Sequence, residues 1–379
     1  PSPSPPQERE ADTGDEGRGM STSSFPPGRI VESAGHHLLS GRSPGRLVIE
    51  AVESRLLAGN RPGDPTVRHL PVYLPPSYDE TPTRRYPVIY LLAGYSGTGL
   101  SFLSYQCFSP SLPERLDGLM MSGRMAEAIV VMADGMTRYG GSQFIDSLAT
   151  GPYQRFIAEE TVSHIDARYR TVPTREGRAI AGKSSGGYGA VRLAMERGDI
   201  FAACACHAGD MYFEYAYLPD IPKAVNVIVP FGSLLSYMEH FERIPKKRSA
   251  DFTAINIIAM AAAYSATDAN EEGDGLGFWL PFDFDTGALR EQVWARWLMH
   301  DPIRMLDGHA DALRKLSLLY IDVGAQDEYN LQIGARILRD RLGARGIAHR
   351  YEEFSDGHRE TSYRYDVSLP ALRAVLADS

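Results

Sequence analysis

The sequence lacks the features that mark several specialised classes of protein. It has only three cysteines among 379 residues, too few for a disulfide framework in a chain of this length. Cys204 and Cys206 lie two apart in an apolar run and Cys107 stands alone, and we interpret them as buried or unused thiols. No stretch reaches the ~18 consecutive apolar residues of a membrane span. We therefore predict neither a disulfide scaffold nor a transmembrane segment.

Basic residues are fewer than acidic ones. The 39 Lys and Arg residues against 48 Asp and Glu give a formal net charge of −9. Binding of nucleic acid requires a basic surface, and anionic membranes also attract basic segments, so the composition argues against both partners. No basic segment followed by an apolar stretch marks a signal peptide. We expect a cytoplasmic location, or a secreted protein if a signal has already been removed.

Apolar residues are nearly missing from residues 1–29, which consist mostly of Pro, Ser, Gly and charged side chains. Such a segment buries too little surface to offset the entropy lost on ordering. We predict a disordered N-terminal tail over 1–29 and one folded domain over 30–379.

Two hydrophobic patterns alternate within that domain. Short apolar runs, several of which stop at Gly or a polar loop, predict strands at 47–52, 67–74, 87–94, 128–133, 178–182, 201–206, 316–323 and 351–354. Helical spacing of apolar residues predicts helices at 153–169, 187–197, 331–343 and 369–376. The alternation predicts an α/β fold with a doubly wound, mainly parallel sheet.

One segment, at about 210–300, interrupts the alternation. It contains all three tryptophans, Trp279, Trp294 and Trp297, and no predicted strand of the sheet. An unstructured loop of this length is improbable in a compact domain. We predict a mostly helical, cap-like insertion over one end of the sheet. It is either a lid that lines an apolar or aromatic pocket, a small packed subdomain, or a surface that joins two subunits.

The strongest chemical signal is Gly182-Lys-Ser-Ser-Gly-Gly187, which follows an apolar strand and precedes a helix. This is the setting of a G-x-S-x-G nucleophile elbow, in which the central serine stands above the carboxyl edge of the sheet. The spacing selects Ser184 as the nucleophile, because the residue two before Ser185 is Lys183. The backbone N–H of Ser185, at the helix start, is a candidate oxyanion donor. The alternative is a glycine-rich helix start without catalytic function.

A nucleophilic serine requires a base and an orienting carboxylate, which follow it in the order acid, then His. Asp327 lies in the loop after the strand at 316–323, and it competes with Asp322 and Glu328 for the role of acid. His358 follows the last predicted strand. Because parallel strands end at one edge of the sheet, we expect Asp327 and His358 to meet Ser184 there.

Four segments together resemble a known family, the esterase branch of the α/β-hydrolases that includes S-formylglutathione hydrolases, feruloyl esterases, enterochelin esterases and mycolyltransferases. They are Val-Tyr-Leu-Pro-Pro-Ser-Tyr (72–78), Tyr-Pro-Val-Ile-Tyr-Leu-Leu-Ala-Gly (86–94), Arg-Ala-Ile-Ala-Gly-Lys-Ser-Ser-Gly-Gly-Tyr-Gly (178–189) and Phe-Ser-Asp-Gly-His (354–358). The resemblance runs from about residue 45 to the C-terminus and excludes most of the insertion.

The resemblance implies further site residues. The N–H of Tyr95, after Gly94 at the end of a strand, corresponds to the second oxyanion donor of the family, and Gly94 itself would border the substrate. Asp134 and Gly135, after the next strand, would lie near the same pocket, either as substrate contacts or simply as a turn. The resemblance also supports Asp327 and His358 as acid and base.

We therefore predict a serine carboxylesterase that acts on a small-molecule ester with an apolar or aromatic part. Neither a cofactor nor a metal is expected. The segment that begins at Asp268 matches the opening of a calcium loop, but Trp279 occupies the position of its closing Glu. The alternatives are an acyltransferase that uses the same triad and a non-catalytic binding protein of the same fold.

Overall fold

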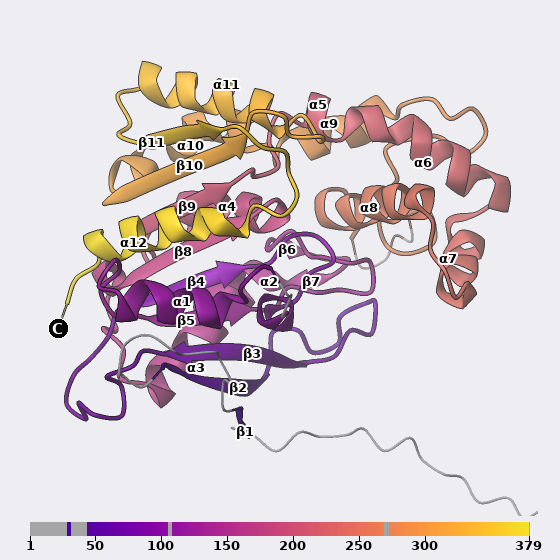
Figure 1. The fold of residues 1–379 in the computed structure, drawn as a ribbon. Coiled ribbons are helices and arrows are strands. Elements are labelled where there is room, and N and C mark those ends of the chain that lie inside the picture. Colours follow the sequence, from indigo (N-terminus) through magenta and orange to yellow (C-terminus); the bar gives the residue numbers. More distant parts are fainter. Residues whose placement is uncertain (1–28, 32–43, 105–107, 269–270, 272, 379) are drawn as a thin grey trace, which may run out of the picture.

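One large sheet organises the computed structural model, which describes residues 29–31, 44–104, 108–268, 271 and 273–378. Among these residues, nine strands pair in the order β1-β2-β3-β5-β4-β8-β9-β10-β11 (Figure 1). Their bounds are β1 Arg29–Val31, β2 Arg46–Glu53, β3 Val67–Leu74, β4 Val88–Leu92, β5 Ile129–Ala133, β8 Arg178–Lys183, β9 Ala203–His207, β10 Leu318–Gly324 and β11 Arg350–Phe354. Two short strands, β6 (Asp146–Ser147) and β7 (Gly151–Pro152), form a separate ribbon.

The direction of the strands confirms the predicted mainly parallel sheet. From β5 across to β11 every neighbouring pair is parallel, whereas β1, β2 and β3 join one edge in antiparallel pairs. Every residue of β4, β5 and β9 is buried. Strands that are covered on both faces are apolar along their whole length, and for this reason the sequence predicts them as continuous apolar runs.

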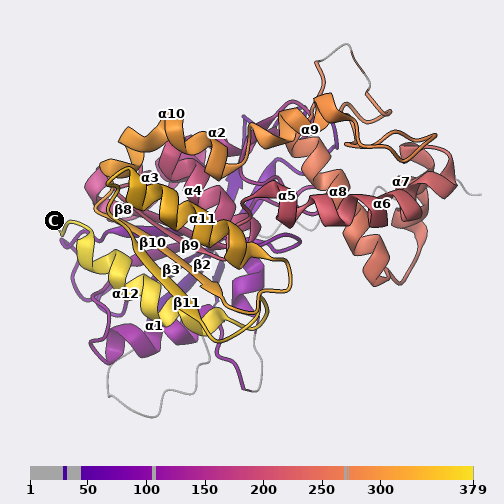
Figure 2. The same ribbon diagram turned by 90° about the horizontal axis from the view of Figure 1, so that it is seen from above.

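Helices cover both faces of the sheet (Figure 2). On one face α1 (Leu112–Met121) and α12 (Tyr365–Val375) pack over a shared apolar core. On the other lie α3 (Val162–Arg168), α4 (Ser185–Glu196), α10 (Pro302–Arg314) and α11 (Leu331–Ala344). The helix predicted at 153–169 is continuous, but α2 (Tyr153–Arg155) and α3 are joined by a π-helical turn at Phe156–Thr161. Short 3-10 helices occur at Gly99–Leu103, Arg175–Gly177 and Ser362–Arg364.

The insertion is helical, as predicted, and projects from one side of the sheet (Figures 1 and 2). Its helices are α5 Phe213–Ala216, α6 Ile221–Ile228, α7 Leu234–Arg243, α8 Ser249–Tyr264 and α9 Glu291–Leu298, with 3-10 turns at Leu218–Asp220 and Val229–Phe231. They enclose a second hydrophobic core, rich in the rings of Phe213, Tyr217, Tyr237, Tyr264, Phe278, Trp294 and Trp297. The division of the chain into tail, domain and insertion stays a prediction, since residues 1–28 lie outside the described residues and Arg29 already begins β1.

Two further predictions concern the cysteines and membrane-spanning segments. Cys204 and Cys206 are buried free thiols on β9, whereas Cys107 lies outside the described residues. In the part of the chain that the structure describes, no single helix is long and apolar enough to cross a membrane. The bent pair Phe213–Phe231 and Leu234–Arg243, at 90° to each other, meets that test only when taken together.

Candidate active site

A sharp turn carries Ser184 between β8 and α4. Ser184 has φ 58° and ψ −126°, a conformation that a residue with a Cβ adopts only where its surroundings impose it. Two backbone hydrogen bonds do so: Ser184 N–H donates to the carbonyl of His207 at 2.9 Å, and its own carbonyl accepts from Tyr188 N–H at 2.9 Å. The strained turn leaves the Ser184 side chain partly exposed at the carboxyl end of β8.

Close backbone contacts explain the glycines on either side of this turn. A Cβ on Gly182 would lie 2.3 Å from the carbonyl oxygen of Gly186, and one on Gly186 would lie 2.1 Å from that of Leu92. Both distances are far inside van der Waals contact, so only glycine lets the end of β4, the end of β8 and the first turn of α4 approach so closely. The geometry is that of a nucleophile elbow.

His358 and Asp327 meet beside the sheet edge, in the loops after β11 and β10. Nδ1 of His358 lies 2.7 Å from Oδ2 of Asp327. The Asp327 side chain is fully buried and that of His358 is 10% exposed. Because an ionised carboxylate only accepts, Nδ1 of the imidazole carries the hydrogen and Nε2 is left as the acceptor. That tautomer is the one a general base requires.

The structure also separates the three candidate acids by their partners. Only Asp327 bonds the ring of His358. Glu328 instead accepts the backbone N–H of His358 at 2.6 Å, and it thereby fastens the loop. Asp322 lies inside β10 and pairs with His207.

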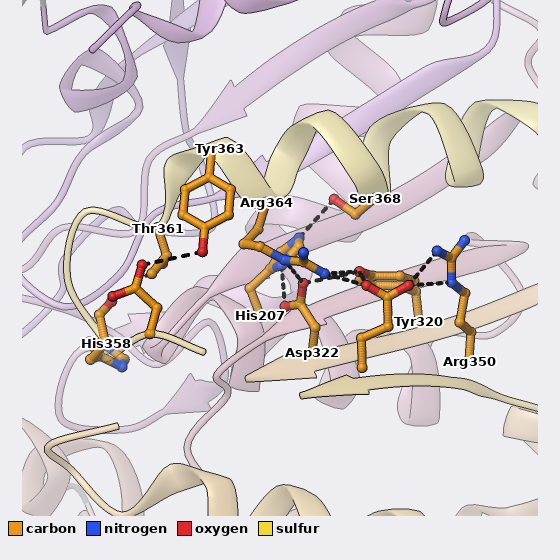
Figure 3. A network of polar contacts seen from close by, with 11 residues as sticks. His207, Tyr320, Asp322, Arg350, His358, Thr361, Tyr363, Arg364 and Ser368 are labelled. Carbon is orange, nitrogen blue, oxygen red and sulfur yellow. Dashed lines mark hydrogen bonds and ion pairs between the residues drawn. The ribbon is translucent and has the colours of Figure 1, made fainter. Parts of the chain in front are cut away.

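The pair of Asp322 and His207 belongs to a buried network beside the His358 loop (Figure 3). His207 joins Asp322 through Nδ1 at 2.5 Å and Ser368 through Nε2 at 2.8 Å. Although the order Ser, His, Asp imitates a triad, Ser368 and Asp322 are both 0% exposed, so no substrate reaches them. Arg364, six residues after His358, donates through Nε to Asp322 at 2.8 Å. The network thus ties the chain after His358 to the strand that leads to Asp327.

The pKa of Asp322 reflects the balance between its burial and its charged partners in the network. Burial pushes the pKa of its carboxyl up, but the charge of His207 and the hydrogen bonds from His207 and Arg364 outweigh burial. The net result is an Asp322 pKa below its usual value. Asp322 is therefore a stably ionised anchor.

The two predicted oxyanion donors, Tyr95 and Ser185, lie after the end of β4 and at the start of α4. A Cβ on Gly94 would lie 3.5 Å from the Cβ of Ser184, so the chain leaving β4 passes directly beside the elbow. Tyr95 follows, and its hydroxyl donates to the carbonyl of Tyr139 at 2.7 Å. Ser185 is the first residue of α4, where backbone N–H groups lack partners within the helix.

The remaining predicted site residues have local structural contacts. Asp134 accepts the N–H of Met136 at 2.9 Å and lies 3.5 Å from the guanidinium of Arg68. A Cβ on Gly135 would lie 2.4 Å from the ring of Phe144. These contacts fit a turn, and contact of Asp134 or Gly135 with substrate stays a prediction.

One buried acid at this edge of the sheet was not predicted from the sequence. Asp210, which follows β9, is 7% exposed and accepts a hydrogen bond from the hydroxyl of Ser185 at 3.2 Å. Its position after a strand of the sheet could have marked it as a candidate site residue, but its hydrogen-bond partners come from distant segments.

The structure also bears on metal binding. The described residues contain no group of three or more His, Cys, Asp or Glu side chains placed to hold an ion. Residues 269, 270 and 272 of the calcium-like segment lie outside the described residues.

A serine elbow in a mainly parallel sheet, followed by an Asp–His pair in the loops after later strands, defines the α/β-hydrolase class. The chain belongs to the family described as "Putative esterase", whose sequence model matches residues 65–372. This confirms the esterase family that the sequence motifs resemble.

Individual relatives are more distant. An esterase of Mycobacterium tuberculosis is 32% identical over 140 residues, 36% of this chain and 28% of that protein. An endo-1,4-beta-xylanase/feruloyl esterase of Xylanibacter ruminicola is 29% identical over 160 residues, 41% of this chain and 21% of that protein. The matched region therefore spans between a fifth and a third of the length of these curated relatives.

Solved structures share the fold at low identity. A ferulic acid esterase matches with a TM-score of 0.57 and 18% identity, covering 89% of this chain and all of that one. An S-formylglutathione hydrolase of Agrobacterium tumefaciens matches with a TM-score of 0.54 and 15% identity, covering 90% of this chain and 99% of that one. These likenesses confirm the α/β-hydrolase fold.

Proposed function

We propose that this protein is a serine carboxylesterase whose triad is Ser184, His358 and Asp327. The observation that carries the proposal is the 2.7 Å bond between His358 and Asp327 at the sheet edge where the strained turn presents Ser184. Membership of an esterase family supports the same conclusion. Its action without a cofactor and its cytoplasmic location stay predictions.

The reaction follows from these positions. Oγ of Ser184 attacks the ester carbonyl while Nε2 of His358 takes the hydroxyl proton, and Asp327 stabilises the imidazolium that forms. The N–H groups of Tyr95 and Ser185 donate to the tetrahedral oxyanion. Collapse breaks the bond to the alcohol, which leaves with the proton from His358. A water molecule, deprotonated by His358, then attacks the acyl-serine, and the acid leaves as Ser184 regains its proton.

The insertion supports an ester with an apolar or aromatic part as substrate. Tyr95, next to the elbow, packs its side chain against the aromatic core of the insertion, so apolar surface begins at the residue whose N–H is a proposed oxyanion donor. The names of the matched relatives, a feruloyl esterase and a ferulic acid esterase, agree with an aromatic acyl group.

The test is covalent labelling by a fluorophosphonate together with hydrolysis of p-nitrophenyl esters. Ser184→Ala is expected to abolish labelling and to lower kcat on the order of 10⁴-fold or more. Ser368→Ala is the matched control. It removes the serine of the buried Ser368–His207–Asp322 network, and the probe should label this variant to the same extent as the wild type. Labelling of Ser184→Ala would refute the mechanism. Addition of competing alcohols would reveal an acyltransferase by the new ester formed.

A further inference from the structure

The insertion is hydrogen-bonded directly to the residue that follows the proposed nucleophile. Asp210 lies where the chain leaves β9 and enters the insertion. Its Oδ2 accepts from the hydroxyl of Ser185 at 3.2 Å, from Nε2 of Gln143 at 3.1 Å and from the hydroxyl of Tyr217 at 2.8 Å. Three donors converge on one buried oxygen, which offsets part of the cost of burying a carboxylate.

Gln143 extends this contact to a second point of the insertion. Its Nε2 lies 3.0 Å from the hydroxyl of Tyr217, beside α5, and 3.0 Å from that of Tyr264, at the end of α8. Gln143 is 1% exposed and has φ 54°, a backbone conformation that persists only where the surroundings impose it. We call Ser185, Asp210, Gln143, Tyr217 and Tyr264 the bridging cluster.

The far end of the insertion is fastened to the same helix. The hydroxyl of Tyr188 on α4 donates to the carbonyl of His300 at 3.1 Å, and Nη1 of Arg192 lies 3.0 Å from Nδ1 of His300. Asp301 next to it accepts the N–H of Phe213 at 3.0 Å, which joins the last residues of the insertion to the first. Movement of the insertion away from α4 would break several buried hydrogen bonds at once.

We propose that Asp210, Tyr217 and Tyr264 are positioning residues for ester hydrolysis, and that the insertion is a fixed support of the oxyanion site instead of a hinged lid. The bridging cluster holds the side chain of Ser185 and so fixes the direction of its N–H, the proposed oxyanion donor. This inference rests on the function proposed above.

The electrostatics of Asp210 fit this role. Burial raises the pKa of its carboxyl above the usual value and outweighs the hydrogen bonds from Tyr217 and Gln143, which act in the opposite direction. A carboxylate without partners would repel an oxyanion beside it. The raised pKa favours the neutral carboxyl, and the three donors offset the charge of the ionised form.

Tyr217→Phe and Tyr264→Phe test the proposal, because each removes one hydroxyl and keeps the ring in its aromatic core. We expect kcat for p-nitrophenyl esters to fall on the order of tenfold, less than when an oxyanion donor is removed outright, with KM changed less than twofold. Tyr237→Phe is the matched control. Its ring is also buried in the insertion, but among the described residues its hydroxyl makes only a long hydrogen bond, to the carbonyl of Asp251 at 3.5 Å. The variant should retain wild-type kcat.

A boronic acid that mimics the tetrahedral oxyanion separates positioning from mere packing. Its Ki should rise in parallel with the loss of kcat in Tyr217→Phe, and near-UV circular dichroism should match the wild type. Asp210→Asn keeps the shape and one acceptor oxygen, so it should lose less activity than Asp210→Ala even if the alanine variant folds poorly.

The outcomes distinguish this inference from the proposed function. If the wild type hydrolyses esters and reacts with a fluorophosphonate, but Tyr217→Phe and Tyr264→Phe keep full kcat, the positioning role is overturned and the esterase stands. A rise in KM with kcat unchanged also overturns it, because the tyrosines are then only pocket walls. A wild type that neither hydrolyses esters nor reacts with the probe refutes the proposed function itself.

Discussion

Acid should loosen the junction between the insertion and α4, because His300 is held there in its neutral form. The imidazole stacks on the ring of Tyr264, with centroids 5.1 Å apart, and its Nδ1 accepts from Arg192. Burial, and then the charge of Arg192, lower the pKa of His300 to about 4. In the unfolded chain the pKa of His is about 6.5. Between these values the unfolded state binds a proton that the native state does not, so stability is lost as the pH falls.

The size of the loss follows from the two pKa values. The free energy of unfolding should decrease by about 2 kcal/mol between pH 7.5 and pH 5, and by about 3 kcal/mol at pH 4. Other groups also titrate in this range, so the quantity to compare is the difference between the wild type and His300→Gln. Glutamine keeps an acceptor for Arg192 but does not titrate.

Urea unfolding followed by tryptophan fluorescence provides the measurement, because all three tryptophans lie in the insertion. The free energy of unfolding of the wild type should fall more steeply with acid than that of His300→Gln, by the amounts given above. Parallel pH dependences of the two proteins between pH 4.5 and 7.5 would refute the reasoning. They would mean that His300 has the same pKa in the native protein as in the unfolded chain, so that burial and Arg192 do not lower it.

Two further substitutions test the scaffold of the site. Arg364→Met removes the guanidinium that neutralises the buried Asp322 and leaves His207 to share that charge alone. It should lower the free energy of unfolding by about 3 kcal/mol and lower kcat, with partial recovery in Arg364→Lys, as urea titration and steady-state kinetics would show. Gly186→Ala places a methyl group 2.1 Å from a backbone oxygen and should cost about 3 kcal/mol or more. Gly118→Ala, on α1 with no atom within 4 Å of its Cβ, should instead be neutral or stabilise by up to ~1 kcal/mol.

The sheet was predictable from the sequence because its central strands are buried on both faces and must be apolar throughout. Helices were harder to read. Neither α1 nor α10 was predicted, although Asp301-Pro302 carries the start signal of α10, where the Asp301 side chain accepts the N–H of Ile303. A capping signal spans only a few residues. This one lies directly after the long insertion, and it was therefore not recognised as the start of a helix that packs on the sheet.

Within the candidate site, features set by neighbouring residues could be predicted from the sequence, whereas contacts between distant segments could not. The elbow at Ser184 was predictable because its glycines are neighbours in sequence. The choice between Asp327 and Glu328 depended on which way two adjacent side chains point, which alternation alone does not determine. The partnership of Asp210 with Gln143 is beyond sequence reasoning, since it requires a left-handed backbone at Gln143 and a contact across 67 residues.

The bridging cluster divides the insertion into an inner part and an outer part. Tyr217 and Tyr264 contact the sheet edge through Gln143, and His300 and Asp301 hold the last residues to α4 and α5. By contrast, α6 and α7 project away from the sheet in both views (Figures 1 and 2). Substitutions in the outer helices can therefore reshape the insertion without moving Ser185, whereas a change at either tyrosine alters the oxyanion site itself. If that division holds, an outer substitution changes KM for different acyl groups, and an inner one changes kcat for all of them.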